Sequence, residues 1–290
     1  MKRVLVIGEY HPELKAALDD AVKNGLIKSY INFTTYAQQA DEVFNKTGLP
    51  QAVYHNQEEF ILSFAKRDDI MHDWIVMKGH IHSADFLRLA MKLNKAIAAK
   101  YVLLTKTLSH CAILERGNMR FILTDAAFNL ALSEDNARSI RDNAVECYYE
   151  LIKDDTTGLA ALEGAPKTVY VLAENNTNIP GYEFKDILQQ FWNYSYKSID
   201  VLQLDAALDL DIAKLKNSKI TSKDLADILI VPDINVGNAI WKSLTVFGDF
   251  TVAGIVWGMF IPCLLNSRGD KKASYYRSLE YGVKILPYAD

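Results

Sequence analysis

Five consecutive residues near the C-terminus, Asn-Ser-Arg-Gly-Asp at 266–270, could together bind a phosphate-containing substrate. Arg268 carries a planar guanidinium that suits a phosphate group. A helix predicted to begin near residue 271 would offer free backbone N–H groups to the same anion. The cluster follows an apolar stretch with strand character, and ligands of open α/β sheets sit beyond the carboxyl ends of strands. The alternative is that Ser267 and Asp270 only stabilise the start of the helix and that Arg268 is solvated.

Other familiar catalytic motifs are absent from the sequence. There is no G-x-G-x-x-G after a strand, no Walker A loop, no C-x-x-C pair, no H-E-x-x-H and no G-x-S-x-G. His80 and His82 alternate at a predicted strand end but lack an obvious third ligand. We therefore expect no metal site there and interpret the two histidines as solvated residues of a turn.

Short Val/Ile/Leu-rich runs alternate with stretches of helical periodicity along most of the chain. Strands that are apolar on both faces and alternate with helices indicate a largely parallel sheet covered on both sides, which is the α/β class. The predicted strands are 4–7, 74–77, 168–172, 228–231 and 252–256, and helices are predicted over 12–23 and 84–94.

One region departs from this alternation. The runs 109–114 and 120–123 are strand-like and are joined by 115–119, which contains Gly117-Asn118, so they predict a β-hairpin. A domain boundary is expected just after the hairpin. The polar stretch 154–167 could be a second boundary or an ordinary loop.

Composition excludes several classes of protein. Half of the 290 residues are hydrophobic and 23% are charged, which is typical of a globular protein and suggests two domains. The formal net charge of -4 argues against general nucleic-acid binding, which needs a basic surface. No stretch is apolar for long enough to cross a bilayer, and the apolar run after Arg3 is too short for a signal peptide.

Three cysteines lie far apart in apolar contexts, at Cys111, Cys147 and Cys263. This pattern favours buried, reduced thiols over disulfides or a zinc site. The protein is therefore expected in the cytoplasm, with no nucleic-acid or membrane partner.

An ordered set of short motifs resembles the phosphate acetyl/butyryltransferase family, most closely its butyryl branch. The C-terminal signature lies in 253–256, Pro262 and 267–270. It is reinforced by 226–238 and 242–244, and upstream by 77–79, 85–88, 108–110, 124–129 and 143–145. The resemblance runs from about residue 74 to the end of the chain.

The resemblance implies a two-domain fold like that of isocitrate and isopropylmalate dehydrogenases, with mostly parallel sheets and an interdomain cleft. The first domain would comprise 1–128 plus 258–290 and the second 129–257. It also implies transfer of a short acyl group, acetyl, butyryl or branched, between coenzyme A and inorganic phosphate. Coenzyme A would be a substrate, with no bound cofactor or metal, and the enzyme would be a homodimer joined through the second domain.

Residue roles follow from the same resemblance. Arg268 would hold the phosphate or acyl phosphate, Ser267 would hydrogen-bond the thioester carbonyl or the sulfur, and Asp270 would take the proton of the coenzyme A thiol. Further substrate contacts are expected from two sets of residues. These are Lys78, Thr124, Asp125 and Asn129, and then Asn235, Asn238 and Lys242.

The chain departs from the family pattern between 164 and 224. An Asp-Gly-Pro turn of the relatives is replaced by Asp205-Ala206-Ala207, and Ser274 stands where the acetyl branch has an acidic residue. Alternative functions are therefore a non-catalytic acyl-CoA or phosphate sensor of the same fold, a same-fold acyl-ACP:phosphate acyltransferase, or a dehydrogenase. Asp125 is the next candidate for the base.

Overall fold

The computed structural model describes residues 1–33, 57–152, 166–171, 199–216 and 225–286. The chain divides into two compact units, the first made of Met1–Lys106 with Thr251–Asp290 and the second of Thr107–Phe250. The predicted domain limits, 128 and 258, differ from these limits. The predicted hairpin lies wholly in the second unit, because its second strand pairs with a strand of that unit, and strand 251–257 lies in the first.

The first unit is built on neighbouring strands in the order β2-β1-β3-β10-β9. All neighbours are parallel except β10 and β9, which are antiparallel. The strands are β1 (Arg3–Ile7), β2 (Ser29–Phe33), β3 (Trp74–Lys78), β9 (Thr251–Trp257) and β10 (Cys263–Leu264). β1 and β3 are buried almost throughout, as expected of parallel strands covered on both faces.

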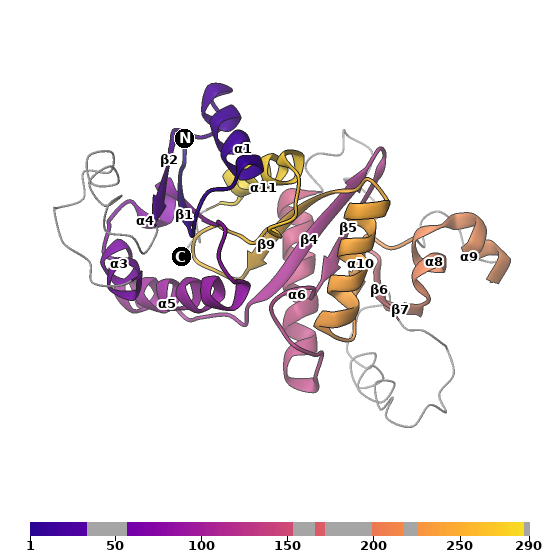
Figure 1. Ribbon diagram of the computed structural model, residues 1–290. Helices are drawn as coiled ribbons and strands as arrows, with labels where there is room; N and C mark the ends of the chain where they lie inside the picture. Colours follow the sequence, from indigo (N-terminus) through magenta and orange to yellow (C-terminus); the bar gives the residue numbers. More distant parts are fainter. Residues whose placement is uncertain (34–56, 153–165, 172–198, 217–224, 287–290) are drawn as a thin grey trace. The chain divides into compact units, whose positions relative to one another are not determined.

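Helices flank this sheet (Figure 1). α1 packs against α11, α11 packs against β9 and β10, and α5 packs against α3 and β3. The helices are α1 (Pro12–Lys23), α3 (Gln57–Phe64), α4 (Ile70–Asp73), α5 (Ser83–Tyr101) and α11 (Lys272–Lys284). α1 begins with Pro12, whose fixed φ suits the first helical position, and it matches the prediction at both ends.

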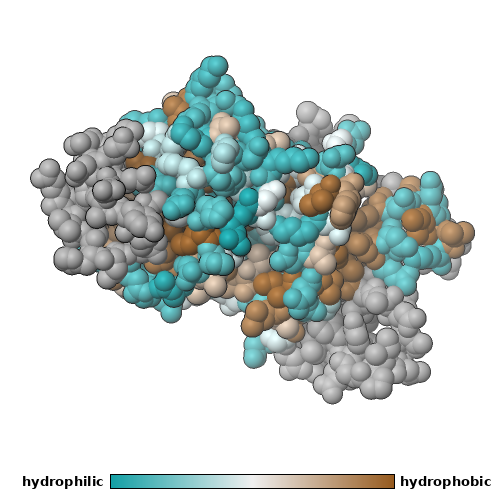
Figure 2. Space-filling model, viewed as in Figure 1, coloured by the Kyte–Doolittle hydropathy of each residue, from teal (hydrophilic) through white to brown (hydrophobic). Residues whose placement is uncertain are grey.

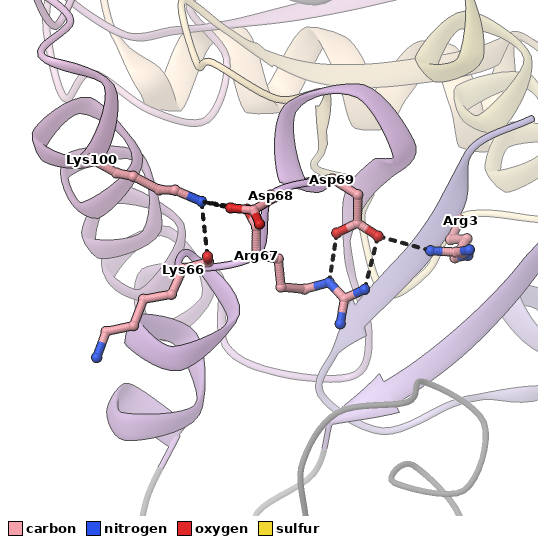
Figure 3. Close-up of polar contacts among 6 residues, drawn as sticks. All are labelled: Arg3, Lys66, Arg67, Asp68, Asp69 and Lys100. Carbon is pink, nitrogen blue, oxygen red and sulfur yellow. Dashed lines mark hydrogen bonds and ion pairs between the residues drawn. The ribbon is translucent and has the colours of Figure 1, made fainter.

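A charged cluster secures the amino ends of β1 and β3 (Figure 3). The carboxylate of Asp69 accepts hydrogen bonds from Arg67 at 2.7 and 2.8 Å and from Arg3 at 3.0 Å. Both guanidinium groups lie over the ring of Trp74. The hydrogen bonds from Arg67 lower the pKa of Asp69, so the carboxylate stays ionised at neutral pH. This cluster lies at the strand ends opposite to those that carry the candidate site, and we interpret it as structural.

The second unit has the strand order β4-β5-β8-β6-β7, in which only β4 and β5 are antiparallel neighbours. Its strands are β4 (Ser109–Arg116), β5 (Met119–Thr124), β6 (Thr168–Val171), β7 (Ile199–Leu202) and β8 (Ile228–Ile230). Its helices are α6 (Glu134–Leu151), α8 (Leu204–Leu208), α9 (Leu210–Lys216) and α10 (Ile234–Phe247). The predicted α/β class and mostly parallel sheet are confirmed.

The predicted hairpin is also confirmed. Only Gly117 and Asn118 separate β4 from β5, and Gly117 has the positive φ of 57° that such a turn requires. All three cysteines are free and buried, and burial raises the pKa of Cys263. In the part of the chain that the structure describes, no helix is long and apolar enough to cross a membrane. The stretch 154–167 lies almost entirely outside the described residues.

Candidate functional site

The Asn-Ser-Arg-Gly-Asp cluster forms a loop between β10 and α11, at the carboxyl end of β10. β10 runs parallel to β3, and β3 runs parallel to β1, so the carboxyl ends of the three strands meet at one edge of the sheet. Gly79 lets the loops after β1 and β3 lie against each other, because a Cβ there would come within 2.7 Å of the carbonyl oxygen of Glu9. The loop thus lies where ligands of an α/β sheet bind.

Asp270 organises this loop from within. Its Oδ2 accepts hydrogen bonds from the backbone N–H of Ser267 at 2.9 Å and from Nδ2 of Asn266 at 3.2 Å. The residue is only 6% exposed. α11 begins at Lys272 and its N-cap is Lys271, whose side chain makes no capping hydrogen bond; the backbone N–H of Lys272 instead donates to the carboxylate of Glu13 at 2.7 Å. The alternative in which Ser267 or Asp270 caps this helix is therefore wrong.

Arg268 is exposed, and its side chain makes no hydrogen bond or ion pair with any residue that the structure describes. Ser267 beside it is half-buried, and its Oγ accepts a hydrogen bond from Gly269 N–H at 3.3 Å. When the backbone of an arginine is held in place and its guanidinium has no ion-pair partner, the guanidinium can bind an anion without first breaking an ion pair.

Lys78 is the last residue of β3 and is 2% exposed. Its Nζ donates to the carbonyl oxygen of Gly79 at 3.3 Å. The first unit therefore brings Lys78 to the same sheet edge as Ser267, Arg268 and Asp270.

Sequence reasoning missed two residues that contact this loop. The hydroxyl of Tyr275 donates to the carbonyl oxygen of Ser267 at 2.6 Å, and Nε2 of His11 lies 2.8 Å from the same hydroxyl. Both positions carry a signal that could have found them: His11 follows the carboxyl end of β1, and Tyr275 lies in the first turn of the helix after the loop.

His80 and His82 are exposed, as predicted for residues of a turn. Among the described residues, no group of three or more His, Cys, Asp or Glu side chains is placed to hold a metal ion.

In the second unit Asp125 lies at the end of β5 and is 4% exposed. Its carboxylate accepts five hydrogen bonds. They come from the backbone N–H groups of His110, Ala127, Phe128 and Asn129, at 2.8–3.2 Å, and from Nδ2 of Asn129 at 2.6 Å. This carboxylate holds the 125–129 loop in shape, and its acceptor capacity is occupied.

The loop after β5 and the start of α10 lie side by side. Gly237 of α10 packs so closely on Ala126 that a Cβ there would come within 2.8 Å of its Cα. The backbone N–H of Ile234 also donates to the carbonyl oxygen of Leu130 at 3.0 Å. The structure therefore brings Thr124, Asp125 and Asn129 near the helix start that carries Asn235 and Asn238.

The start of α10, where substrate contacts are expected from Asn235 and Asn238, is capped by a side chain of the same helix start. Asp233 is the N-cap, and its carboxylate accepts from the N–H groups of Asn235 at 2.7 Å and Val236 at 3.0 Å. These two donors are satisfied by an internal carboxylate, so they are not available to bind an anion. Asn238 is exposed, and Lys242 lies over the ring of Trp241 at 4.3 Å.

Two buried polar atoms at these loops have no hydrogen-bond partner among the described residues: Oδ1 of Asn266 and Oγ1 of Thr124. Buried polar atoms without partners are uncommon in folded proteins and need an explanation. Asn266 lies in the 266–270 loop, and Thr124 is the last residue of β5, directly before the 125–129 loop.

The role of Asp125 can be tested by stability. Asp125→Asn leaves the side-chain volume almost unchanged but replaces an acceptor oxygen by an amide that faces backbone N–H donors. We expect the free energy of unfolding to fall by about 2–3 kcal/mol, because buried donors lose a charged partner. Urea unfolding measures the change. Asp233→Asn is the matched control, since asparagine caps a helix as well as aspartate does and should change stability little.

Comparison with known proteins supports one family. The family described as "Phosphate acetyl/butaryl transferase" matches residues 199–279, which include α10 and the 266–270 loop. A phosphate acetyltransferase of Rickettsia felis is 26% identical over a match that covers 74% of this chain and 59% of the relative. The chain thus spans about three fifths of that protein. A phosphate butyryltransferase of Clostridium acetobutylicum is 27% identical, with 98% of this chain and 93% of the relative covered.

Solved structures agree. A branched-chain phosphotransacylase from Enterococcus faecalis has a TM-score of 0.70 and 27% identity, with 98% of each chain covered. A phosphotransacetylase from Streptococcus pyogenes shares the fold at a TM-score of 0.61 and 17% identity, covering 98% of this chain and 93% of the other. By these matches the chain is similar to phosphate acetyltransferases and phosphate butyryltransferases, and in fold to phosphotransacylases.

Proposed function

We propose that the protein transfers a short acyl group between coenzyme A and inorganic phosphate, so that acyl-CoA and phosphate interconvert with acyl phosphate and coenzyme A. The observation that carries this proposal is the guanidinium of Arg268, which has no hydrogen-bond or ion-pair partner among the described residues and is exposed on a loop whose backbone is held by the buried Asp270. The likeness to a branched-chain phosphotransacylase over 98% of both chains supports it.

In the direction of acyl-CoA synthesis, the thiol of coenzyme A loses its proton to Asp270 and its sulfur attacks the carbonyl carbon of the acyl phosphate. The C–S bond forms, the bond between the carbonyl carbon and the bridging oxygen breaks, and phosphate leaves with the electron pair and takes up the proton that Asp270 then releases. Arg268 neutralises charge on the phosphate, and the Ser267 hydroxyl donates to the oxygen on which charge develops. The thiol pKa near 8.5 makes a base useful at neutral pH.

The other predicted residues divide by their contacts. Lys78 and Lys242 are proposed to bind phosphate groups of coenzyme A, and Thr124, Asn235 and Asn238 to contact substrate. Asp125 and Asn129 act by shaping their loop. Coenzyme A is the second substrate, and no bound cofactor or metal is proposed.

We also propose a cytoplasmic homodimer. α10 is strongly apolar, yet Val246 and Phe247 are 62% and 85% exposed, and hydrophobic surface gathers over this helix (Figure 2). Such a surface suits contact with a second copy, which sedimentation of the assayed protein would reveal. The buried free cysteines fit a reducing compartment.

The direct test is a stoichiometric assay with purified protein, butyryl phosphate and coenzyme A. We expect phosphate release and loss of free thiol in equal amounts, with neither when one substrate is omitted. Acetyl and isobutyryl phosphate would rank the acyl groups. Tight binding of coenzyme A without turnover of any acyl phosphate would contradict the proposal and favour a sensor.

A further inference from the structure

We propose that Tyr275 and His11 are positioning residues for Ser267 and Arg268. The phenol of Tyr275 holds the carbonyl of Ser267, and the imidazole of His11 holds the phenol. This inference rests on the proposed function for its effect on catalysis, but the anchoring itself can be tested without activity.

The peptide groups on both sides of the Ser267 Cα are fixed. Its N–H donates to Oδ2 of Asp270 at 2.9 Å, and its carbonyl oxygen accepts from the Tyr275 hydroxyl at 2.6 Å. The side chain of Arg268, the next residue, has no partner among the described residues. The direction of the guanidinium therefore depends on how well the backbone of Ser267 is held. Tyr275 supplies one of three anchors; the others are the carboxylate of Asp270 and its backbone N–H, which donates to the same carbonyl oxygen at 3.1 Å.

The hydrogens can be assigned from the donors and acceptors alone. The Ser267 carbonyl can only accept, so the single hydrogen of the Tyr275 hydroxyl must point to it. The contact between that hydroxyl and Nε2 of His11, at 2.8 Å, then requires a hydrogen on Nε2. His11 donates to Tyr275, and Tyr275 donates to Ser267.

The surrounding charges keep this arrangement at neutral pH. Burial, His80 and Lys78 lower the pKa of His11 while Glu13 opposes them, so a neutral imidazole with its hydrogen on Nε2 is favoured. Burial, followed by the negative charges of Asp270 and Glu13, raises the pKa of Tyr275, so the phenol keeps its hydrogen. His11 can therefore donate to Tyr275, and Tyr275 to the Ser267 carbonyl, at neutral pH.

Tyr275→Phe retains the ring, which packs edge-on against His11 at 5.0 Å, and removes both hydrogen bonds. Because small misplacements of a binding group cost up to about 100-fold in rate, we expect kcat/KM for acyl phosphate to fall about 10- to 100-fold. The neighbouring Tyr276→Phe is the matched control: its hydroxyl contacts Asn24 and not the loop, so it should stay within about twofold.

A double-mutant cycle separates positioning from general damage. If Tyr275 acts through Arg268, then Tyr275→Phe should cost less than about threefold in an Arg268→Ala background. An undiminished loss in that background would overturn the proposal. So would Tyr275→Phe kinetics equal to those of Tyr276→Phe.

A second test of the anchoring does not require catalytic activity. Trypsin cleaves after arginine, and Arg268 is exposed, so the rate of cleavage at this bond reports how well the loop is held. We expect faster cleavage after Arg268 in Tyr275→Phe than in wild type or Tyr276→Phe, measured by mass spectrometry. His11→Gln, which can place an N–H donor near Nε2, should resemble wild type, whereas His11→Leu should be cleaved faster.

Equal cleavage rates in all variants would overturn the anchoring, whatever the assay shows. If the wild-type protein turned over no acyl phosphate but the rates ranked as expected, the proposed function would fail and the anchoring would stand. If Tyr275→Phe failed to fold, the two His11 variants would decide the question.

Discussion

Replacing Arg268 by alanine is expected to lower kcat/KM for acyl phosphate by about 100- to 1,000-fold, the usual range for losing one donor to a charge that develops in the transition state. The side chain is exposed and has no hydrogen-bond or ion-pair partner among the described residues, so its removal breaks no such interaction with them and should leave the unfolding temperature unchanged. The loss should appear mainly with phosphate and acyl phosphate, and less in the KM for coenzyme A.

Two further variants sharpen this result. Arg268→Lys keeps the charge but lacks the fork that binds two phosphate oxygens, so it should recover only part of the activity. Lys271→Ala removes a nearby exposed cation and should change little if a specific contact, rather than the local field, is responsible. Near wild-type kinetics for Arg268→Ala would show that the arginine does not bind the phosphate.

The sequence was informative where local chemistry and local structure coincide. The 12–23 helix was predicted at its true limits because Pro12 marks its start and its apolar residues share one face. The hairpin was predictable because Gly117 and Asn118 form the turn between adjacent strands. The 266–270 loop was placed correctly at a strand end, since the apolar run before it is followed by charged residues.

Contacts between distant residues could not be read in this way. His11 and Tyr275 are 264 positions apart and meet only because β1 and β10 each flank β3. Asp125 looked like a candidate for the cleft or the base, but its five donors come from His110 and from the turn that follows it. Whether a polar side chain is fully hydrogen-bonded to backbone groups depends on the path of the chain, and sequence spacing does not give that path.

The structure also changes the alternative roles that have to be considered for Asp270. The choice between a base and a helix cap becomes a choice between a base and a loop anchor, because its carboxylate holds Ser267 N–H and Asn266 Nδ2. The two roles are compatible. A carboxylate has two oxygens with several acceptor positions, so accepting these two hydrogen bonds at Oδ2 does not by itself prevent the group from taking a proton.

Asp270→Asn distinguishes the roles because the amide oxygen can keep both loop contacts while the group loses its basicity. If Asp270 deprotonates the thiol of coenzyme A, turnover should fall about 100- to 10,000-fold, the range for losing a positioned base. Binding of both substrates and the rate of tryptic cleavage after Arg268 should change little. The variant should also recover rate as pH rises past the thiol pKa of about 8.5, because the thiol then ionises in solvent without a base.

If Asp270 is only a loop anchor, asparagine should serve nearly as well. A loss below about threefold with no recovery at high pH would therefore assign it the structural role alone, and the thiol proton would have to leave by another route.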